Sequence, residues 1–240
     1  MPVESRSILV LRLIRYGEQS GVVHALEPEF GRIAVYVPGI NRGKGRLSAG
    51  LFLPLSMLRV SLFRKTSDLK HSLPTVREAE AEYRYERLYD DPYRSGIALF
   101  LAEWFDKAIA EQGSIESLWV FVQAALKAYD HCAEVVLFPH WILAKTASFL
   151  GYAIKAAPGP DWYFDGEQGG WIRMAGGERA SGTDRLLSSL VGADFDEMQS
   201  MTSTASERAK LIELLLDFHR RHLPGMGELK SLEVLRVLWG

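Results

Sequence analysis

The residues of this chain that could do chemistry are cations and aromatic rings close to its N-terminus. Residues 31–70 contain eight basic side chains and one acidic side chain, a net charge of +7 in a chain whose total is −2. Residues 1–72 together carry +6, and the remaining residues carry −8. A local positive potential attracts polyanions even when the whole chain is weakly negative. We therefore expect a nucleic acid as the first partner to consider and a membrane surface as the second, while a solvated basic face without function is the alternative.

Alternation places arginines beside aromatic rings on two predicted strands. Residues 33, 35 and 37 share one face, which leaves Arg32 and Tyr36 on the other; residues 58, 60 and 62 leave Arg59 and Phe63 outward in the same way. Guanidinium groups contact phosphates and rings stack on bases of any sequence, so the pattern is typical of single-strand binding. The alternative is that both rings pack against a second domain. The predicted nucleic-acid contacts are Arg32, Tyr36, Arg42, Lys44, Arg46, Arg59, Phe63, Arg64 and Lys65.

Nucleotide hydrolysis is the first catalytic chemistry to weigh. The loop from Gly39 to Gly45 has the glycines and the lysine of a phosphate-binding loop, but its glycine spacing is one residue short and no serine or threonine follows Lys44 to hold magnesium. The chain also lacks HExxH and GxSxG motifs. We therefore expect a binding protein and not an enzyme.

Metal binding is disfavoured as well. His219 and His222 lie close enough to share a metal, but the two arginines between them favour a solvated basic helix end. The acidic residues within Asp194–Glu197 lack the glycine and the spacing of a calcium loop and favour a helix N-terminus. Cys132 is the only cysteine, which excludes an internal disulfide and a four-thiolate zinc site. We expect no metal and no cofactor.

Five strand-like runs must position the basic stretch. They are short, have almost no helical pattern between them and predict a small antiparallel barrel over residues 1–81. The predicted strands are Ser5–Arg15, Val22–Leu26, Ile33–Val37, Leu51–Phe63 with an early interruption at Pro54, and Leu73–Ala81.

Helical patterns dominate residues 82–240, so the predicted fold class is α+β with two domains. Asp91 and Pro92 predict a helix start and Gly113 its end, and a capping box at Thr204–Glu207 predicts another helix that ends before Pro224. Further helices are predicted at Ser114–Cys132, Phe138–Leu150 and Ser231–Leu238. Residues 151–182 are rich in glycine and predict a small hairpin, formed by Trp162–Asp165 and Gly170–Met174.

No secretory signal pattern opens the sequence, and no run reaches the roughly 18 apolar residues of a membrane span. We therefore expect a cytoplasmic protein.

Several short motifs, in order along the chain, resemble a known family. They are Tyr16–Ser20, Phe30-Gly31, Pro38-Gly39 leading into residues 42–47, Asp91-Pro92, Phe149–Tyr152 and Leu223–Leu232. Together they resemble the bacterial recombination mediator RecO, whose N-terminal domain is an OB-fold. The resemblance implies a DNA repair protein that binds single- and double-stranded DNA, anneals complementary strands, contacts the acidic tail of single-strand-binding protein, and works with RecR to load RecA.

One departure from the family concerns zinc. Many RecO proteins carry four zinc-binding cysteines after the position of Tyr152, and this chain has none there, so zinc is not implied. The predicted hairpin would take the place of that region.

A second hypothesis remains open at this point. In it the protein is a non-catalytic adaptor, whose helical domain binds a peptide in a groove while the basic barrel adds weak affinity for nucleic acid.

Overall fold

The computed structural model describes residues 3–17, 19–40, 47–63, 73–111, 113–132, 136–174 and 179–239. The chain forms two compact units. The first consists of Met1–Val120 with Leu229–Leu235, and the second of Phe121–Glu228 with Arg236–Gly240. The domain boundary expected after residue 81 stays a prediction.

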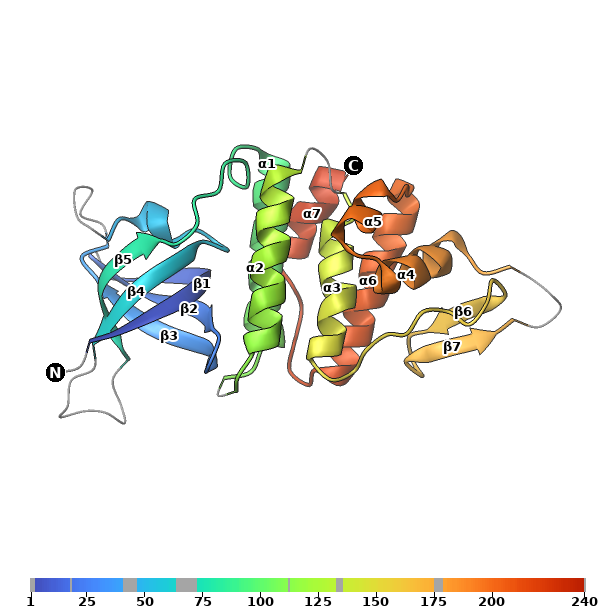
Figure 1. The fold of residues 1–240 in the computed structure, drawn as a ribbon, viewed down its shortest axis with the longest axis horizontal. Helices are drawn as coiled ribbons and strands as arrows, with labels where there is room; N and C mark the ends of the chain where they lie inside the picture. The colour runs from blue at the N-terminus through green and yellow to red at the C-terminus, as the bar shows by residue number, and fades with distance from the viewer. Residues whose placement is uncertain are drawn as a thin grey trace. The chain divides into compact units, whose positions relative to one another are not determined.

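Five strands of the first unit close into a barrel in the order β1-β2-β3-β5-β4, as Figure 1 shows. The strands are β1 (Val3–Tyr16), β2 (Ser20–Glu27), β3 (Gly31–Pro38), β4 (Met57–Phe63) and β5 (Thr75–Ala81). Every pairing is antiparallel except that of β3 with β5. The predicted α+β class and the OB-type barrel are confirmed.

The predicted strand from Leu51 starts later than expected. Residues Ala49–Phe52 form a 3-10 helix (η1), and β4 begins only at Met57. Pro54 has no N–H to donate to a ladder, and Leu55 adopts a φ of 65°, so the chain turns here before it joins the sheet.

Alternation along the strands fills the barrel. The core contains Ile8, Val10, Val23, Val35, Val37, Leu58, Val60 and Val76, all essentially inaccessible to solvent. Because side chains alternate across a strand, their sequence neighbours point outward. The inward and outward faces expected for β3 and β4 therefore agree with the structure.

Helix α1 (Pro92–Ala108) begins as predicted, with Asp91 as its N-cap, but ends before Gly113. Ile109 already has an extended backbone, and Glu111 pairs with Gly31 at the start of β3. The residues after Ala108 thus extend the sheet instead of the helix, because the carbonyl of Ala110 accepts the N–H of Arg32 at 3.1 Å.

The carboxylate of Glu103 on α1 holds the start of α7 (Ser231–Trp239). It accepts the backbone N–H groups of Lys230 and Ser231 at 3.1 and 2.7 Å and the Ser231 hydroxyl at 2.5 Å. Burial raises the pKa of Glu103, but the hydrogen bonds from Ser231, Lys230 and Lys107 outweigh burial and leave this pKa below its ordinary value. The carboxylate is therefore ionised at neutral pH and satisfies the orphan N–H groups of the helix start.

Helices and one hairpin make up the second unit. Helix α2 (Glu116–His131) enters it from the first unit, and α3 (Phe138–Phe149), α4 (Gly182–Gly192), α5 (Phe195–Ser200) and α6 (Ala205–His222) follow. Strands β6 (Trp162–Asp165) and β7 (Gly170–Arg173) form the predicted hairpin. Among the described residues, no helix has the length and apolar character needed to cross a membrane.

The two candidate cation sites in this unit have structural explanations. Asp194 and Glu197 form the capping box of α5, as an acidic helix start predicts. His219 corrects the expectation of a solvated helix end, because it is fully buried, donates from Nε2 to the carbonyl of Leu143 at 3.0 Å and accepts the Tyr152 hydroxyl at Nδ1 at 2.8 Å. Burial lowers the pKa of His219 to about 4, so the ring is neutral.

Gly31 is the position where the barrel is most sensitive to an added side chain. Its φ is +70°, and a Cβ would lie 2.7 Å from the carbonyl oxygen of Ala110 and 3.0 Å from that of Gly113. Gly39 has the same φ, but no atom lies within 4 Å of the position of its Cβ. We predict that Gly31→Ala loses more stability than Gly39→Ala, which pays only the backbone strain of about 1–3 kcal/mol. Thermal unfolding of the two variants measures the difference, and equal losses would contradict the close packing at Gly31.

Candidate nucleic-acid interface

The strand register aligns five outward side chains across the barrel wall. Each is outward because a neighbouring residue in the chain packs in the core. We call them the interface row: Ile14, Val22, Tyr36, Thr75 and Phe63, from β1, β2, β3, β5 and β4 in turn. The row brings the two rings predicted to stack on bases, Tyr36 and Phe63, to either side of Thr75. Since neighbouring strands lie about 4.8 Å apart, the two ring-bearing residues are separated by about 10 Å.

Arg77 adds a cation to this row. The register between β4 and β5 shifts between Ser61 and Leu62, so Arg77 is an extra, unpaired residue of β5 and its side chain is exposed. Its guanidinium carbon lies 4.2 Å from the centroid of the Phe63 ring. Among the described residues Arg77 forms no ion pair. A guanidinium stacked on a ring and free of carboxylates is suited to contact a phosphate while the ring contacts a base.

Tyr16 is a further exposed ring close to the row. It lies at the end of β1, is paired with Ser20 and has 73 % of its surface exposed. The sequence reading missed both Tyr16 and Arg77. The alternation that exposes Ile14 predicts an outward Tyr16, and the inward Val76 likewise predicts an outward Arg77. Arg77 follows the basic stretch, and the bulge that leaves it without a partner on β4 is not visible in the sequence.

Arg32 and Arg59 are the arginines of the predicted set that the structure describes, and each lies next to a carboxylate. Arg32 Nη1 lies 3.5 Å from Asp106 Oδ1, and its Nη2 donates to Glu111 at 3.1 Å. Arg59 Nη2 lies 2.5 Å from a carboxylate oxygen of Glu82. Their roles as phosphate contacts stay predictions. The remaining predicted contacts, Arg42, Lys44, Arg46, Arg64 and Lys65, lie outside the described residues.

Away from the row, the wall formed by β4 and β5 is acidic. A polar cavity of about 340 Å³ lies there. It is lined by Ser5, Arg59, Ser61, Glu78, Ala79 and Glu80. With Glu82 paired to Arg59, this part of the wall has more carboxylates than cations and does not favour a polyphosphate.

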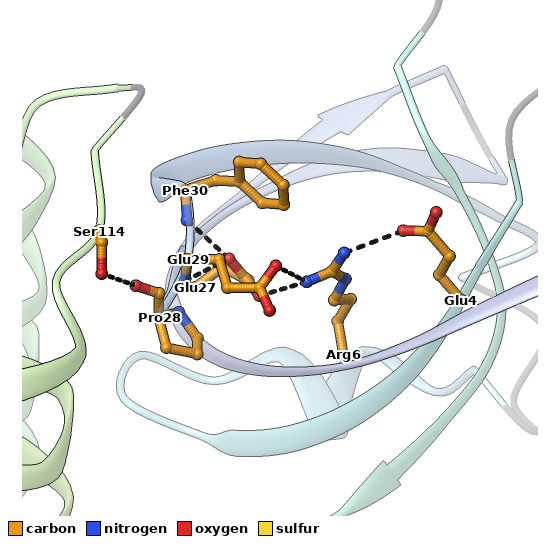
Figure 2. Close-up of polar contacts among 7 residues, drawn as sticks. All are labelled: Glu4, Arg6, Glu27, Pro28, Glu29, Phe30 and Ser114. Carbon is orange, nitrogen blue, oxygen red and sulfur yellow. Dashed lines mark hydrogen bonds and ion pairs between the residues drawn. The ribbon is translucent and has the colours of Figure 1, made fainter.

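At the opposite end of the β2–β3 hairpin, a second cluster of charges is structural (Figure 2). Buried Glu27 accepts the N–H groups of Glu29 and Phe30, both at 2.8 Å, and lies 3.3 Å from Arg6 Nη1. Arg6 also contacts Glu4 and Glu29, and the Phe30 ring packs over its guanidinium. The hydrogen bond that Arg6 donates to the Glu29 carboxylate is the main reason why the pKa of Arg6 is raised. This cluster fixes the turn whose Pro28 carbonyl accepts the Ser114 hydroxyl at 3.4 Å, and it leaves no cation for a phosphate.

The described residues contain no group of three or more histidine, cysteine, aspartate or glutamate side chains arranged to hold a metal ion. The candidate interface is a surface of rings and cations on a closed five-stranded barrel, and this architecture is of the OB class.

Comparison with known protein families identifies the family to which this chain belongs. Residues 1–83 match the family model "Recombination protein O N terminal", and residues 89–233 match "Recombination protein O C terminal". Since the two models together cover nearly the whole chain, this protein belongs to the RecO family of DNA repair and recombination proteins.

Full-length relatives carry the same name. The chain is 27 % identical over 237 residues to a DNA repair protein RecO of Phocaeicola vulgatus, with 96 % of this chain and 97 % of the relative covered. It is 25 % identical over 241 residues to the RecO of Flavobacterium johnsoniae and 27 % identical over 249 residues to that of Porphyromonas gingivalis, with all of both chains covered in each case. The predicted family is confirmed.

The rings of the interface row give a first test of the site. Replacing Phe63 or Tyr36 with leucine removes a stacking surface and keeps the charge. We predict a loss of about 1–3 kcal/mol in binding to single-stranded DNA for each ring that contacts a base, without a change in salt dependence. Phe30→Leu is the matched control, because Phe30 is half exposed but lies at the far end of the hairpin. Fluorescence anisotropy with a labelled oligothymidylate measures all three variants, and equal affinities would remove the rings from the site.

Proposed function

We propose that this protein is a recombination mediator that binds single-stranded DNA along the interface row and anneals complementary strands. The observation that carries the proposal is the placement of Tyr36 and Phe63 on either side of Thr75, with Arg77 stacked on Phe63. Rings give affinity for any base, and the cation supplies a phosphate contact. Double-stranded DNA would be bound mainly through its phosphates, by the basic side chains of residues 42–46 and 64–65.

The partners are proposed from the resemblance to the family. We propose that the protein acts with RecR to load RecA on DNA that is coated with single-strand-binding protein. We also propose that it catalyses no reaction itself, since its sequence contains neither a nucleophile motif nor a metal-binding motif of the known types. A nuclease assay with magnesium tests this last point, and cleavage of a labelled strand would refute it.

Binding measured against salt tests the main proposal. If three to five phosphates are contacted, the logarithm of affinity for a single strand falls against the logarithm of salt concentration with a slope of about −2 to −3.5. The triple variant Arg42→Ala, Lys44→Ala and Arg46→Ala should bind all sequences more weakly to a similar degree, with a slope shallower by about 2.

The control for the triple variant makes the same charge change elsewhere. Lys127, Lys155 and Lys210 are exposed lysines of the second unit, and their replacement with alanine should leave the slope unchanged. A flat salt response of the wild-type protein would refute the electrostatic part of the proposal. Unchanged binding of the triple variant would remove the loop from the site.

Peptide binding is the second candidate function, and a cavity of about 360 Å³ in the first unit supports it. Leu11, Leu99 and Val234 line it with apolar surface, and Arg12 and Lys230 also belong to its lining. Its two carboxylates, Glu103 and Asp106, already accept hydrogen bonds or ion pairs from within the unit. Because Arg12 is already paired with Asp106, Lys230 is the cation of this lining that a carboxylate of an acidic, partly apolar tail would contact.

A charge placed in this cavity separates the two functions. We predict that Val234→Asp weakens binding of a labelled acidic peptide that ends in apolar residues and leaves binding to DNA unchanged. Val237→Asp is the control, because Val237 is 81 % exposed and does not line the cavity. Isothermal titration with the peptide measures the effect. Equal losses for both variants, or none, would exclude the cavity as the peptide site.

A further inference from the structure

Helix α1 and the segment after it surround Arg32 with acceptors. Arg32 Nη1 lies 3.5 Å from Asp106 Oδ1 and also donates to the Asp106 carbonyl, and Nη2 donates to Glu111 at 3.1 Å. The side chain is 27 % exposed, and its Nε is buried without a hydrogen-bond partner among the described residues. A phosphate could reach this guanidinium only by displacing a carboxylate from it.

Asp106 also neutralises a second arginine of the barrel wall. Arg12 Nε lies 2.7 Å from Asp106 Oδ2, and His24 Nδ1 lies 3.9 Å from Asp106 Oδ1. Desolvation by burial and the nearby Arg12 are the main reasons why the pKa of His24 is lowered, so this ring adds no charge at neutral pH. Two guanidinium groups thus face the two carboxylates of Asp106 and Glu111, and the cluster has no net charge to attract a polyanion.

The backbone keeps this cluster in place. Arg32 donates its N–H to the Ala110 carbonyl at 3.1 Å, and Gly31 pairs with Glu111 as a bridge. Gly31 packs so closely that a Cβ would clash with two carbonyl oxygens of the neighbouring segment. Withdrawal of Glu111 from Arg32 would therefore break a backbone pairing as well as an ion pair.

At the other end of β3 the situation is reversed. Tyr36, four residues after Arg32 on the same face, is paired with Thr75, and Arg77 nearby contacts a ring instead of a carboxylate. Among the residues that the structure describes, one outer face of the barrel therefore holds a cation without a carboxylate partner at one end and neutralised cations at the other.

We propose that Asp106 and Glu111 form the border of the nucleic-acid track, where they withhold Arg32 and Arg12 from phosphates, and that Arg77 supplies the phosphate contact on the described part of this wall. This inference rests on the proposed binding of single-stranded DNA. It assigns Arg77 a role different from that of Arg32 and Arg12, a difference that the charge pattern alone does not show.

Two double variants that conserve net charge test the inference. Arg32→Gln with Glu111→Gln removes the ion pair, and Arg77→Gln with Glu80→Gln removes the free cation and an exposed carboxylate of the same strand. The ligand is a labelled oligothymidylate of about 16 nucleotides, the upper end of what one OB barrel covers. We expect the first variant to keep the wild-type salt slope and the second to lose about 0.7 from it, the contribution of one phosphate on a single strand.

A third variant tests the same border by gain of binding. Asp106→Asn should release cations to the strand and steepen the slope by about 0.7 for each arginine that then contacts a phosphate. If this variant does not fold, as checked by circular dichroism, the two double variants decide the question alone.

The results of these experiments distinguish a failure of this inference from a failure of the proposed DNA binding. A slope that flattens equally in both double variants would overturn the inference, and so would an unchanged slope in the Arg77 variant; in either case the proposed function stands. A wild-type protein that fails to bind the oligonucleotide would remove the proposed function itself.

Discussion

One backbone pairing closes the barrel and builds the interface, namely the entry of Thr75 between Tyr36 and Phe63. The parallel contact of β3 with β5 consists of a single register pair, supported by the Tyr36 N–H that donates to the Pro74 carbonyl at 2.8 Å. Without it, β3 and β5 would each present an open edge of unpaired backbone groups. Because the register fixes which side chains are neighbours, the same pairing places both rings and the bulged Arg77 on one stretch of wall.

Carboxylates then decide which cations of that wall are available. Arg12, Arg32 and Arg59 each lie within ion-pair distance of an aspartate or glutamate, whereas Arg77 stacks on a ring. A carboxylate that is partly shielded from water and accepts hydrogen bonds from a guanidinium competes with a phosphate for the same N–H donors. The net charge of a segment therefore overstates its attraction for a polyanion, and the pairing of each side chain has to be known.

Local rules predicted most of the fold. Alternation in residues 33–37 and 58–62 gave the correct inward faces, and the caps at Asp91 and Thr204 gave correct helix starts, because each depends on neighbours in the sequence. The errors came from distant partners. The helix expected to reach Gly113 ends at Ala108 because the next residues pair with β3, as Glu111 does with Arg32 from 79 positions away. His219 is buried by contacts with α3 that no helical pattern reveals.

The neighbouring rings of the candidate site could be predicted from the sequence, but the partners of its arginines could not. Rings beside arginines at alternate positions were visible in the sequence, and the register does bring Tyr36 and Phe63 together. Neither the ion pairs of Arg32 and Arg59 nor the bulge at Arg77 could be inferred, since each depends on the position of a residue on another element.

The chemistry of the interface row also bears on the annealing that we propose. Among its five side chains only the hydroxyls of Tyr36 and Thr75 can form hydrogen bonds, so the row offers few groups that could compete for the pairing edges of bases. Stacking uses the face of a base and leaves its Watson–Crick edge open to a complementary strand. A surface that held bases by their edges would bind a single strand tightly but would have to release it before pairing. Binding through faces and phosphates is therefore the mode that permits a second strand to pair while the first is still held.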